Sequence, residues 1–141
     1  MTPTQLLLLP AFVHFVLIVY LLTRTGYGRV RAVRTGRLKL HEIDNNKSGH
    51  PEAIRNFANN YQNQFELPVL FYVVVSFAMI TGLVDSILIG LAWLFVALRV
   101  LHSFVQTGKN DIALRFKVFL AGLIGLAGMW TWFGIRLFVI G

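Results

Sequence analysis

Apolar residues dominate four stretches of the chain, and each is close to the length of a membrane crossing. The stretches cover residues 5–23, 67–83, 87–101 and 116–140. A bilayer span takes about 20 mainly apolar residues, so the second and third must include polar residues from their flanks. Backbone polar groups have to be paired inside lipid, and no barrel-type alternation is present, so helices are expected. The predicted helices cover about 5–24, 51–81, 86–107 and 112–140.

Four such helices indicate an all-α, integral membrane four-helix bundle that forms a single domain over 1–141. The composition supports this fold class, because 56% of the residues are hydrophobic and only 13% are charged. A soluble domain of this size is more polar. Cysteine is absent from the sequence, which excludes disulfides, thiolate metal sites and cysteine nucleophiles. Any thiol chemistry would need a thiol that a ligand brings.

The net charge is +7, and the basic residues are distributed as the positive-inside rule for membrane proteins predicts. The sequence therefore gives no reason to expect nucleic acid as a partner. Most arginines and lysines lie in or beside the connection between the first two helices and around the connection between the last two. The middle connection has only Asp85, and Arg136 is the one basic residue near the end of the last span. We therefore expect both basic connections on the cytoplasmic side, both termini on the other side, and membrane lipids as partners.

Glycine and proline predict where the helices begin and end. The first connection, about 25–51, contains Gly26, Gly28 and Gly36 and is expected to be loop. Pro51 suits the first turn of the second helix, and Pro68 is expected to bend that helix. Asp111 is expected to cap the fourth helix. Small residues that recur along this last helix are interpreted as a packing face.

Polar residues form stripes near the cytoplasmic ends of three predicted helices. In the second helix the stripe has spacing i, i+4, i+8, i+11, which places its members on one face. The third helix has a similar stripe, and the fourth adds Arg115. The stripes consist of Arg55, Asn59, Asn63 and Glu66, and of Arg99, His102, Ser103 and Gln106. Ionisable groups in membrane helices are expected to face other helices or a water-filled cavity.

Two interpretations of the stripes remain open. Glu66 could pair directly with Arg99 or Arg115 while the amides join the helices. Alternatively, because arginines outnumber acids in the stripes, positive charge is left over for an anionic guest with carboxylates. His14 is interpreted as a hydrogen-bonding residue between helices, and His41 and His50 as solvated loop residues. The four histidines lack zinc spacing, so no metal site is expected.

Three segments resemble the MAPEG family, the membrane-associated proteins in eicosanoid and glutathione metabolism. The segment "RVLHSFVQTGKNDIALR" looks like the corresponding part of prostaglandin-synthase members without a gap. "NQFELP" is similar to the family's Asn-x-x-Glu followed closely by proline, and "GYGRVR" to its Gly-x-x-Arg-x-Arg. The resemblance covers nearly the whole chain.

The resemblance implies a homotrimer of four-helix subunits that holds glutathione between neighbouring subunits near the cytoplasmic side. It also implies a bacterial-type homologue in a bacterial inner membrane. Arg115 is the first candidate for stabilising the glutathione thiolate in a transferase or peroxidase reaction with lipophilic electrophiles, and Arg29 is the second candidate. The expected glutathione-binding residues are Arg29, Asn59, Asn63, Glu66, Arg99, His102, Gln106 and Arg115.

The sequence departs from the family pattern at three expected site positions. Asn59 stands where the family has an arginine, Gln106 where it has a tyrosine, and Phe116 where prostaglandin synthases have a serine. These departures support a second hypothesis, a noncatalytic membrane protein that keeps the fold. Its polar pocket would then serve lipid head groups or subunit packing.

Overall fold

The computed structural model describes residues 1–39 and 51–140, and the regular elements in this part of the chain are helical. A π-helical segment, Arg136–Ile140, continues the last α-helix. The α-helices are α1 (Pro3–Arg34), α2 (Glu52–Asn63), α3 (Leu67–Thr81), α4 (Ser86–Thr107) and α5 (Ile112–Ile135).

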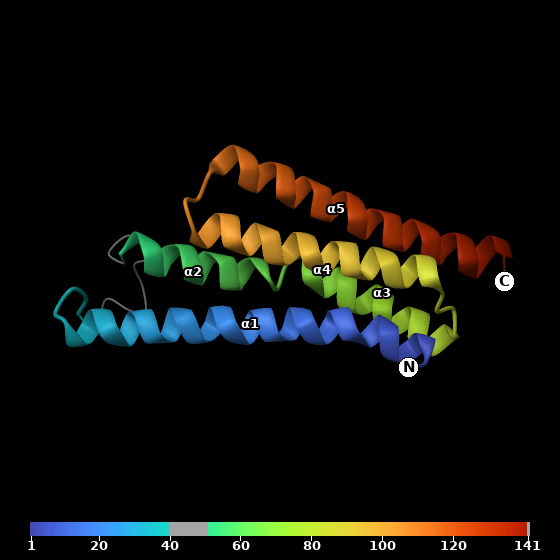
Figure 1. The fold of residues 1–141 in the computed structure, drawn as a ribbon, viewed down its shortest axis with the longest axis horizontal. Helices are drawn as coiled ribbons and strands as arrows, with labels where there is room; N and C mark the ends of the chain where they lie inside the picture. Colours follow the sequence, from blue (N-terminus) through green and yellow to red (C-terminus); the bar gives the residue numbers. More distant parts are fainter. Residues whose placement is uncertain (40–50, 141) are drawn as a thin grey trace.

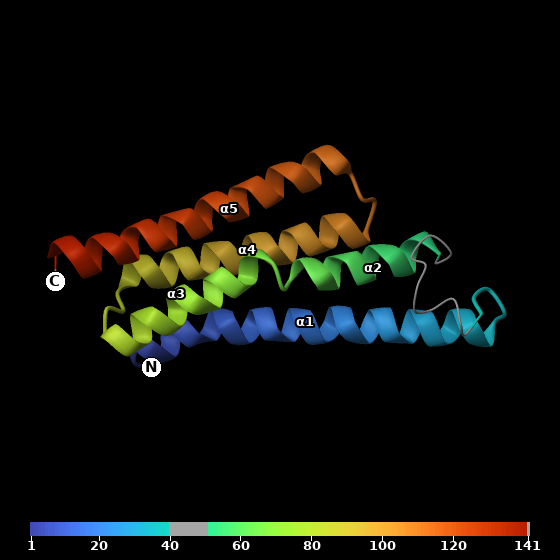
Figure 2. The same ribbon diagram turned by 180° about the vertical axis from the view of Figure 1, so that it is seen from behind.

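The helices form an elongated bundle in which α1 and α5 lie on opposite sides of α4 (Figures 1 and 2). Both termini and the turn between α3 and α4 lie at one end of the bundle, and the connection between α4 and α5 lies at the other (Figure 1). Four helical stretches in the described ranges are long and apolar enough to span a membrane: Pro3–Arg34, Glu52–Thr81, Ser86–Thr107 and Ile112–Ile140. The predicted all-α membrane four-helix bundle is confirmed, and the chain is an integral, multi-pass membrane protein.

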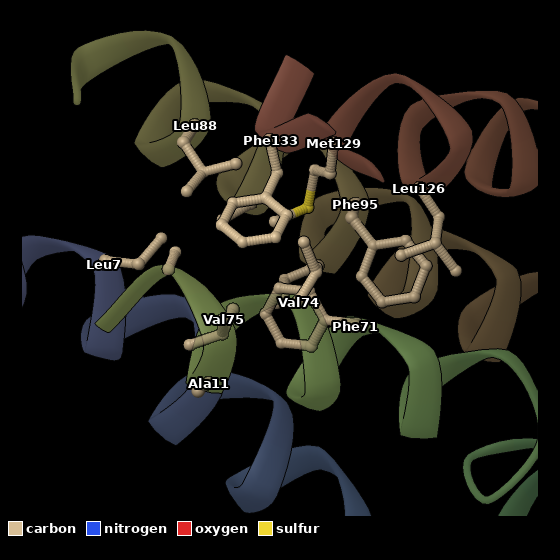
Figure 3. Packing of buried hydrophobic residues seen from close by; sticks show 13 residues of the cluster. Leu7, Ala11, Phe71, Val74, Val75, Leu88, Phe95, Leu126, Met129 and Phe133 are labelled. Carbon is tan, nitrogen blue, oxygen red and sulfur yellow. The ribbon is translucent and has the colours of Figure 1, made fainter. Parts of the chain in front are cut away.

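An apolar core fills the half of the bundle near the termini (Figure 3). Phe71 and Phe95 stack with their ring centroids 4.9 Å apart, and Met129 and Phe133 of α5 close the cluster. On the outside of the bundle, large apolar side chains remain exposed, among them Phe12 and Phe104. In water this surface would be unfavourable, whereas lipid accommodates it. Because this half of the bundle is an apolar core, a polar functional site is expected in the other half.

The first helix is longer than the sequence indicated, since α1 continues to Arg34 and does not end near residue 24. Gly26 and Gly28 were interpreted as loop residues, but glycine inside a helix costs only about 1 kcal/mol. Packing outweighs that cost here. A Cβ added to Gly28 would lie 3.1 Å from Ile54 Cγ1, so the bare glycine lets α1 and α2 approach closely. The helix ends at Thr35 and Gly36, where Gly36 has a φ of 68° that favours glycine.

The second predicted helix is interrupted, because α2 ends at Asn63 and α3 begins at Leu67. The expected bend at Pro68 is instead a break three residues long, over 64–66. Pro68 lies in the first turn of α3, where its missing N–H costs least. Glu66, with φ −95° and ψ −98°, is the cap residue before α3 and is not part of the α2 stripe. By contrast, Pro10 lies within the continuous α1, whose first turns bend away from its long straight part (Figure 1).

The predictions for the last two helices agree with the structure. α4 covers the expected range, and Asp111 Oδ1 accepts a hydrogen bond from the Leu114 N–H, 2.9 Å away, as the N-cap of α5. Asp85 caps α4 in the same way through the Leu88 N–H. The small residues of α5 face α4, since a Cβ on Gly122 or Gly125 would lie 3.9 Å from Leu98 or Leu94. Their interpretation as a packing face is confirmed.

Candidate functional site

A cavity of about 440 Å³ lies between α2, α4 and α5. Its lining includes the last turns of α4 and the first turns of α5, where the two helices diverge (Figure 2). It brings together most of the binding residues that the sequence predicted, which come from three helices and the α2–α3 break. Its lining residues are Asn59, Gln62, Asn63, Glu66, His102, Gln106, Ile112, Arg115, Phe116 and Phe119. Of the predicted binding residues, Arg29 and Arg99 are not in this lining.

Arg115 supplies the cation in the cavity lining. It is half-buried in the first turn of α5, and its Nη1 donates to Asn110 Oδ1 at 2.8 Å. Asn110 has a positive φ of 51°, an unusual conformation that asparagine tolerates better than most residues. The turn before α5 therefore holds one edge of the guanidinium group, and the fork geometry leaves other N–H groups for a ligand.

Arg99 and His102 lie one turn apart on α4, both almost fully buried, and both contact Phe119. The Arg99 guanidinium carbon is 5.7 Å from the Phe119 ring centroid, and the two rings of His102 and Phe119 are 6.1 Å apart. Arg99 Nη2 and His102 Nδ1 have no hydrogen-bond partner among the described residues. Buried polar groups are rarely left in this state. His102 lines the cavity directly, whereas Arg99 reaches it only through Phe119.

Glu66 is exposed at the rim of the cavity and has no basic side chain within 4.0 Å in the described part of the chain. The direct ion pair with Arg99 or Arg115 that the sequence left open is therefore not formed. The α2–α3 break leaves the carboxylate free to meet a cationic group of a ligand.

Some of the amide side chains of the site are hydrogen-bonded to each other. Gln106 Oε1 accepts hydrogen bonds from Asn63 Nδ2 at 3.2 Å and from Asn60 Nδ2 at 3.1 Å. Gln106 is buried, so this oxygen joins α4 to α2. Asn59 and Asn63 line the cavity and retain groups that can hydrogen-bond to a guest.

Asn60 and Gln64 belong to a buried polar network that the sequence analysis did not select. Gln64 Nε2 donates to Asn60 Oδ1 at 2.8 Å, and Ser103 Oγ donates to the same oxygen at 2.9 Å. The helical spacing of Asn56, Asn60 and Gln64 was a signal for this inward face, but the stripe of Asn59 and Asn63 has the same spacing. Buried networks of this kind fix the geometry of the groups around them.

The network continues to His14 of α1. Gln64 Oε1 lies 3.0 Å from His14 Nε2, and the Tyr72 hydroxyl lies 2.9 Å from His14 Nδ1. The interpretation of His14 as a hydrogen-bonding residue between helices is confirmed. His41 and His50 lie outside the described residues. Within residues 1–39 and 51–140, no three His, Asp or Glu side chains are grouped so that they could hold a metal ion.

Arg29 does not join the other predicted site residues within one chain. It lies on α1, whereas Arg115 lies on α5, at the other side of α4 (Figure 1). Its Nε is buried without a hydrogen-bond partner in the described structure.

The cavity offers a cation, an anion, an imidazole and several amides in one space, which suits a small zwitterionic ligand. Comparisons with known proteins bear on the class of that ligand. Neither curated proteins nor solved structures gave a match. One family model does match, over residues 7–135, and its description is MAPEG family. Because this range includes all four membrane-spanning stretches almost completely, the chain belongs to the MAPEG family.

Proposed function

We propose that the cavity between α2, α4 and α5 binds glutathione and that the protein transfers the glutathionyl group to lipophilic electrophiles. The observation that carries this proposal is the shared lining of the cavity by Glu66, His102 and Arg115, which come from three segments of the chain. The family, in general, is related to glutathione metabolism.

Glutathione has two carboxylates, one ammonium group and one thiol, and several of these groups find a complementary side chain in the cavity. Arg115 presents a fork of N–H groups to an anionic oxygen or sulfur. Glu66, exposed and without an ion-pair partner in the described chain, suits the ammonium group. Asn59 and Asn63 suit the peptide groups of the tripeptide.

In the proposed reaction, Arg115 stabilises the glutathione thiolate. A guanidinium group beside a thiol favours its ionised form, and the proton passes to water. The thiolate then forms a sulfur–carbon bond with the electrophile, whose leaving group departs with its electron pair. In the related peroxidase reaction, two glutathione molecules become a disulfide and a hydroperoxide is reduced to an alcohol and water.

The rim of the cavity supports an apolar second substrate. Ile112 and Phe116 line the cavity, and both are largely exposed on the outside of the bundle. In a membrane this surface contacts lipid, so an electrophile dissolved in the bilayer could reach the thiolate without crossing water. Phe116, which departs from the family pattern, fits this apolar rim.

A noncatalytic role is the second candidate function, and one observation favours it. Gln106 stands where the family has a tyrosine, and its Oε1 is already used by Asn60 and Asn63. A cavity that has exchanged a phenol for a structural amide could hold a lipid head group without any chemistry. The two candidates differ in whether the cavity binds glutathione and catalyses its reaction.

We further propose a homotrimer with the cavity end toward the cytoplasm and both termini on the other side. The clustered basic residues of the first and third connections support this orientation through the positive-inside rule. A bacterial inner membrane remains the proposed location on the basis of resemblance.

The experiment is a calorimetric titration of the detergent-purified protein with glutathione, repeated with Arg115→Ala. Loss of one charged hydrogen-bonding group should weaken binding by about ten- to a hundredfold. Lys117→Ala is the matched control, because Lys117 is an exposed cation of the same helix that does not line the cavity, and it should bind like the wild type.

Conjugation of an activated aryl chloride by the same samples then separates the two candidates. Product formation that depends on Arg115 supports the transferase. Binding without turnover contradicts catalysis by this cavity. Absence of binding at about millimolar glutathione would contradict the transferase and is the result that the noncatalytic role predicts.

A further inference from the structure

A second cavity, of about 340 Å³, lies between the end of α1 and the start of α2. It shares no lining residue with the cavity described above. Three arginines line it together with two aromatic residues. The lining comprises Arg24, Tyr27, Gly28, Arg31, Ala32, Thr35, Arg37, Pro51, Ala53, Ile54 and Phe57.

The fold holds the three arginines around this basic cavity. Arg24 and Arg31 lie on the same face of α1 as Gly28, at i−4 and i+3, and Gly28 is where α1 approaches Ile54 of α2. The Arg24 guanidinium carbon lies 5.2 Å from the Phe57 ring centroid. Arg37 follows the turn at Gly36, and its backbone N–H donates to Ala32 O at 2.9 Å.

The positive charge of the basic cavity is not balanced by the described residues. No acidic residue of the described chain lines it, and none has a carboxylate within 4.0 Å of these three guanidinium groups. The position of the cavity along the membrane normal follows from the sequence, because the first apolar stretch ends at Thr23 and Arg24 is the next residue. The cavity therefore begins at the level where phospholipid head groups lie.

An apolar groove of about 470 Å³ runs between α1 and α4, deeper along the same face of α1. Its α1 residues include Val13, Leu17 and Tyr20, which precede Arg24 by eleven, seven and four residues, the spacing of one helix face. Tyr20 also links the two spaces, because its ring centroid is 6.4 Å from that of Phe57 in the basic cavity. One face of α1 thus changes from apolar in the bilayer to basic at its surface.

We propose that this face of α1 binds one anionic phospholipid, with its phosphate in the basic cavity and an acyl chain in the apolar groove. Guanidinium groups bind phosphate oxygens in a bidentate way, and three of them favour a head group with net negative charge. A zwitterionic lipid would add a cation beside Arg24, Arg31 and Arg37. The apolar side chains of the groove lie at membrane depth and suit an acyl chain, which a free anion does not have.

Native mass spectrometry of the detergent-purified protein tests this proposal by titration with dioleoylphosphatidylglycerol or dioleoylphosphatidylcholine. We expect one phosphatidylglycerol retained per chain and about tenfold less phosphatidylcholine. Arg24→Gln with Arg31→Gln should reduce phosphatidylglycerol retention by about tenfold or more. Arg34→Gln with Lys117→Gln removes the same charge outside both spaces and should have little effect. Equal losses in the two double variants would contradict a specific site.

A second pair of variants distinguishes a lipid from a free phosphate. Val16 lines the groove, and Val19 lies on another face of the same helix outside it. Val16→Trp should fill the groove and remove the lipid with no change of charge, whereas Val19→Trp should retain it. If Val16→Trp keeps the wild-type lipid affinity, or if inorganic phosphate displaces the lipid at about millimolar concentration, the cavity holds a free anion and the lipid proposal is wrong. Glutathione binding is not involved in this test, so its outcome is independent of the proposed function.

Discussion

The Asn60 carboxamide uses both of its ends between α2 and α4. Its Nδ2 donates to Gln106 Oε1 and to the Ser103 carbonyl, and its Oδ1 accepts from Ser103 Oγ. The same Oδ1 accepts from Gln64 Nε2, which leads on to His14. Asn60 is fully buried, so water cannot replace these partners. This residue therefore connects the cavity lining with the interior of the bundle.

We predict that Asn60→Leu destabilises the protein by about 2 kcal/mol. Hydrogen bonds between membrane helices contribute about 0.6 kcal/mol each on average, and Asn60 makes three such bonds to α4. Asn56→Leu, one turn earlier on α2 and only half-buried, is the matched control and should cost less than about 0.5 kcal/mol. Thermal unfolding in detergent measures both. Equal stability of the two variants would mean that the network does not hold α2 to α4.

Side-chain roles could be predicted at this scale only in part. The spacing of Asn59, Asn63 and Glu66 indicated one face of the second helix, and all three do line the cavity. The same spacing fits Asn56, Asn60 and Gln64, and α2 has amides on several faces. Which amides point inward depends on partners such as His14 and Ser103, which lie about 40 or more residues away in the sequence. Periodicity within one helix contains no information about those neighbours.

At the scale of helices, the two aspartate caps show how one residue type can serve different purposes. Asp85 and Asp111 cap α4 and α5 through similar bonds of 2.8 and 2.9 Å. Asp85 additionally accepts from Trp132 Nε1 at 2.9 Å and lies 3.6 Å from Arg136 Nε. It thus ties the α3–α4 turn to the end of the last span. The sequence identified Asp85 only as the charge of the middle connection.

We predict that Asp111→Ala destabilises the protein by about 1 kcal/mol, the usual value of an N-cap. Asp85→Ala should cost about 2–3 kcal/mol, because it also removes the acceptor of the Trp132 N–H and the carboxylate that forms an ion pair with Arg136. Asp85→Asn should recover part of the difference, since its amide oxygen can still accept from the backbone and from Trp132. Thermal unfolding under identical detergent conditions compares the three variants. An Asp85→Ala variant as stable as Asp111→Ala would show that the contact with α5 adds nothing.

Helix boundaries were predictable where caps decide them and unpredictable where packing does. Asp111 and the turn before α4 set limits that local chemistry requires. The glycines after residue 24 lie within α1 because Gly28 packs against Ile54, a contact that no local signal contains. The break over 64–66 also depends on tertiary structure, since the buried Gln64 holds this segment against α1 and α4. Pro68 alone indicated a bend and not the loss of a turn.

At the scale of the molecule, run length and the distribution of arginine were enough to predict four spans and a polar end. The four spans and the polar end both follow from the free-energy cost of burying charges and unpaired backbone polar groups in lipid, which is large and applies to any membrane protein. Arg29 could not be placed from the sequence, because the spacing of residues within α1 does not relate it to the other helices. In one subunit it lies on α1, across α4 from the cavity residue Arg115 on α5 (Figure 1). If both arginines serve one glutathione, as the resemblance implies, they must come from different subunits.

A shared site requires an oligomer, and we predict a detergent-corrected mass of three chains of 15.9 kDa. Mixed assemblies test the sharing directly. Arg29→Ala and Arg115→Ala should each weaken glutathione binding in a homotrimer by about ten- to a hundredfold. In a random one-to-one mixture of the two variants, each subunit has an intact Arg29 or an intact Arg115 with a probability of one half. A site needs Arg29 from one subunit and Arg115 from its neighbour. About a quarter of the sites should therefore bind glutathione with the wild-type affinity, as measured by calorimetry.

If the two arginines act within the same subunit, or if the protein is a monomer, mixing the variants restores no binding. Wild-type affinity in Arg29→Ala alone would instead remove this residue from the site while leaving the proposed role of Arg115 intact.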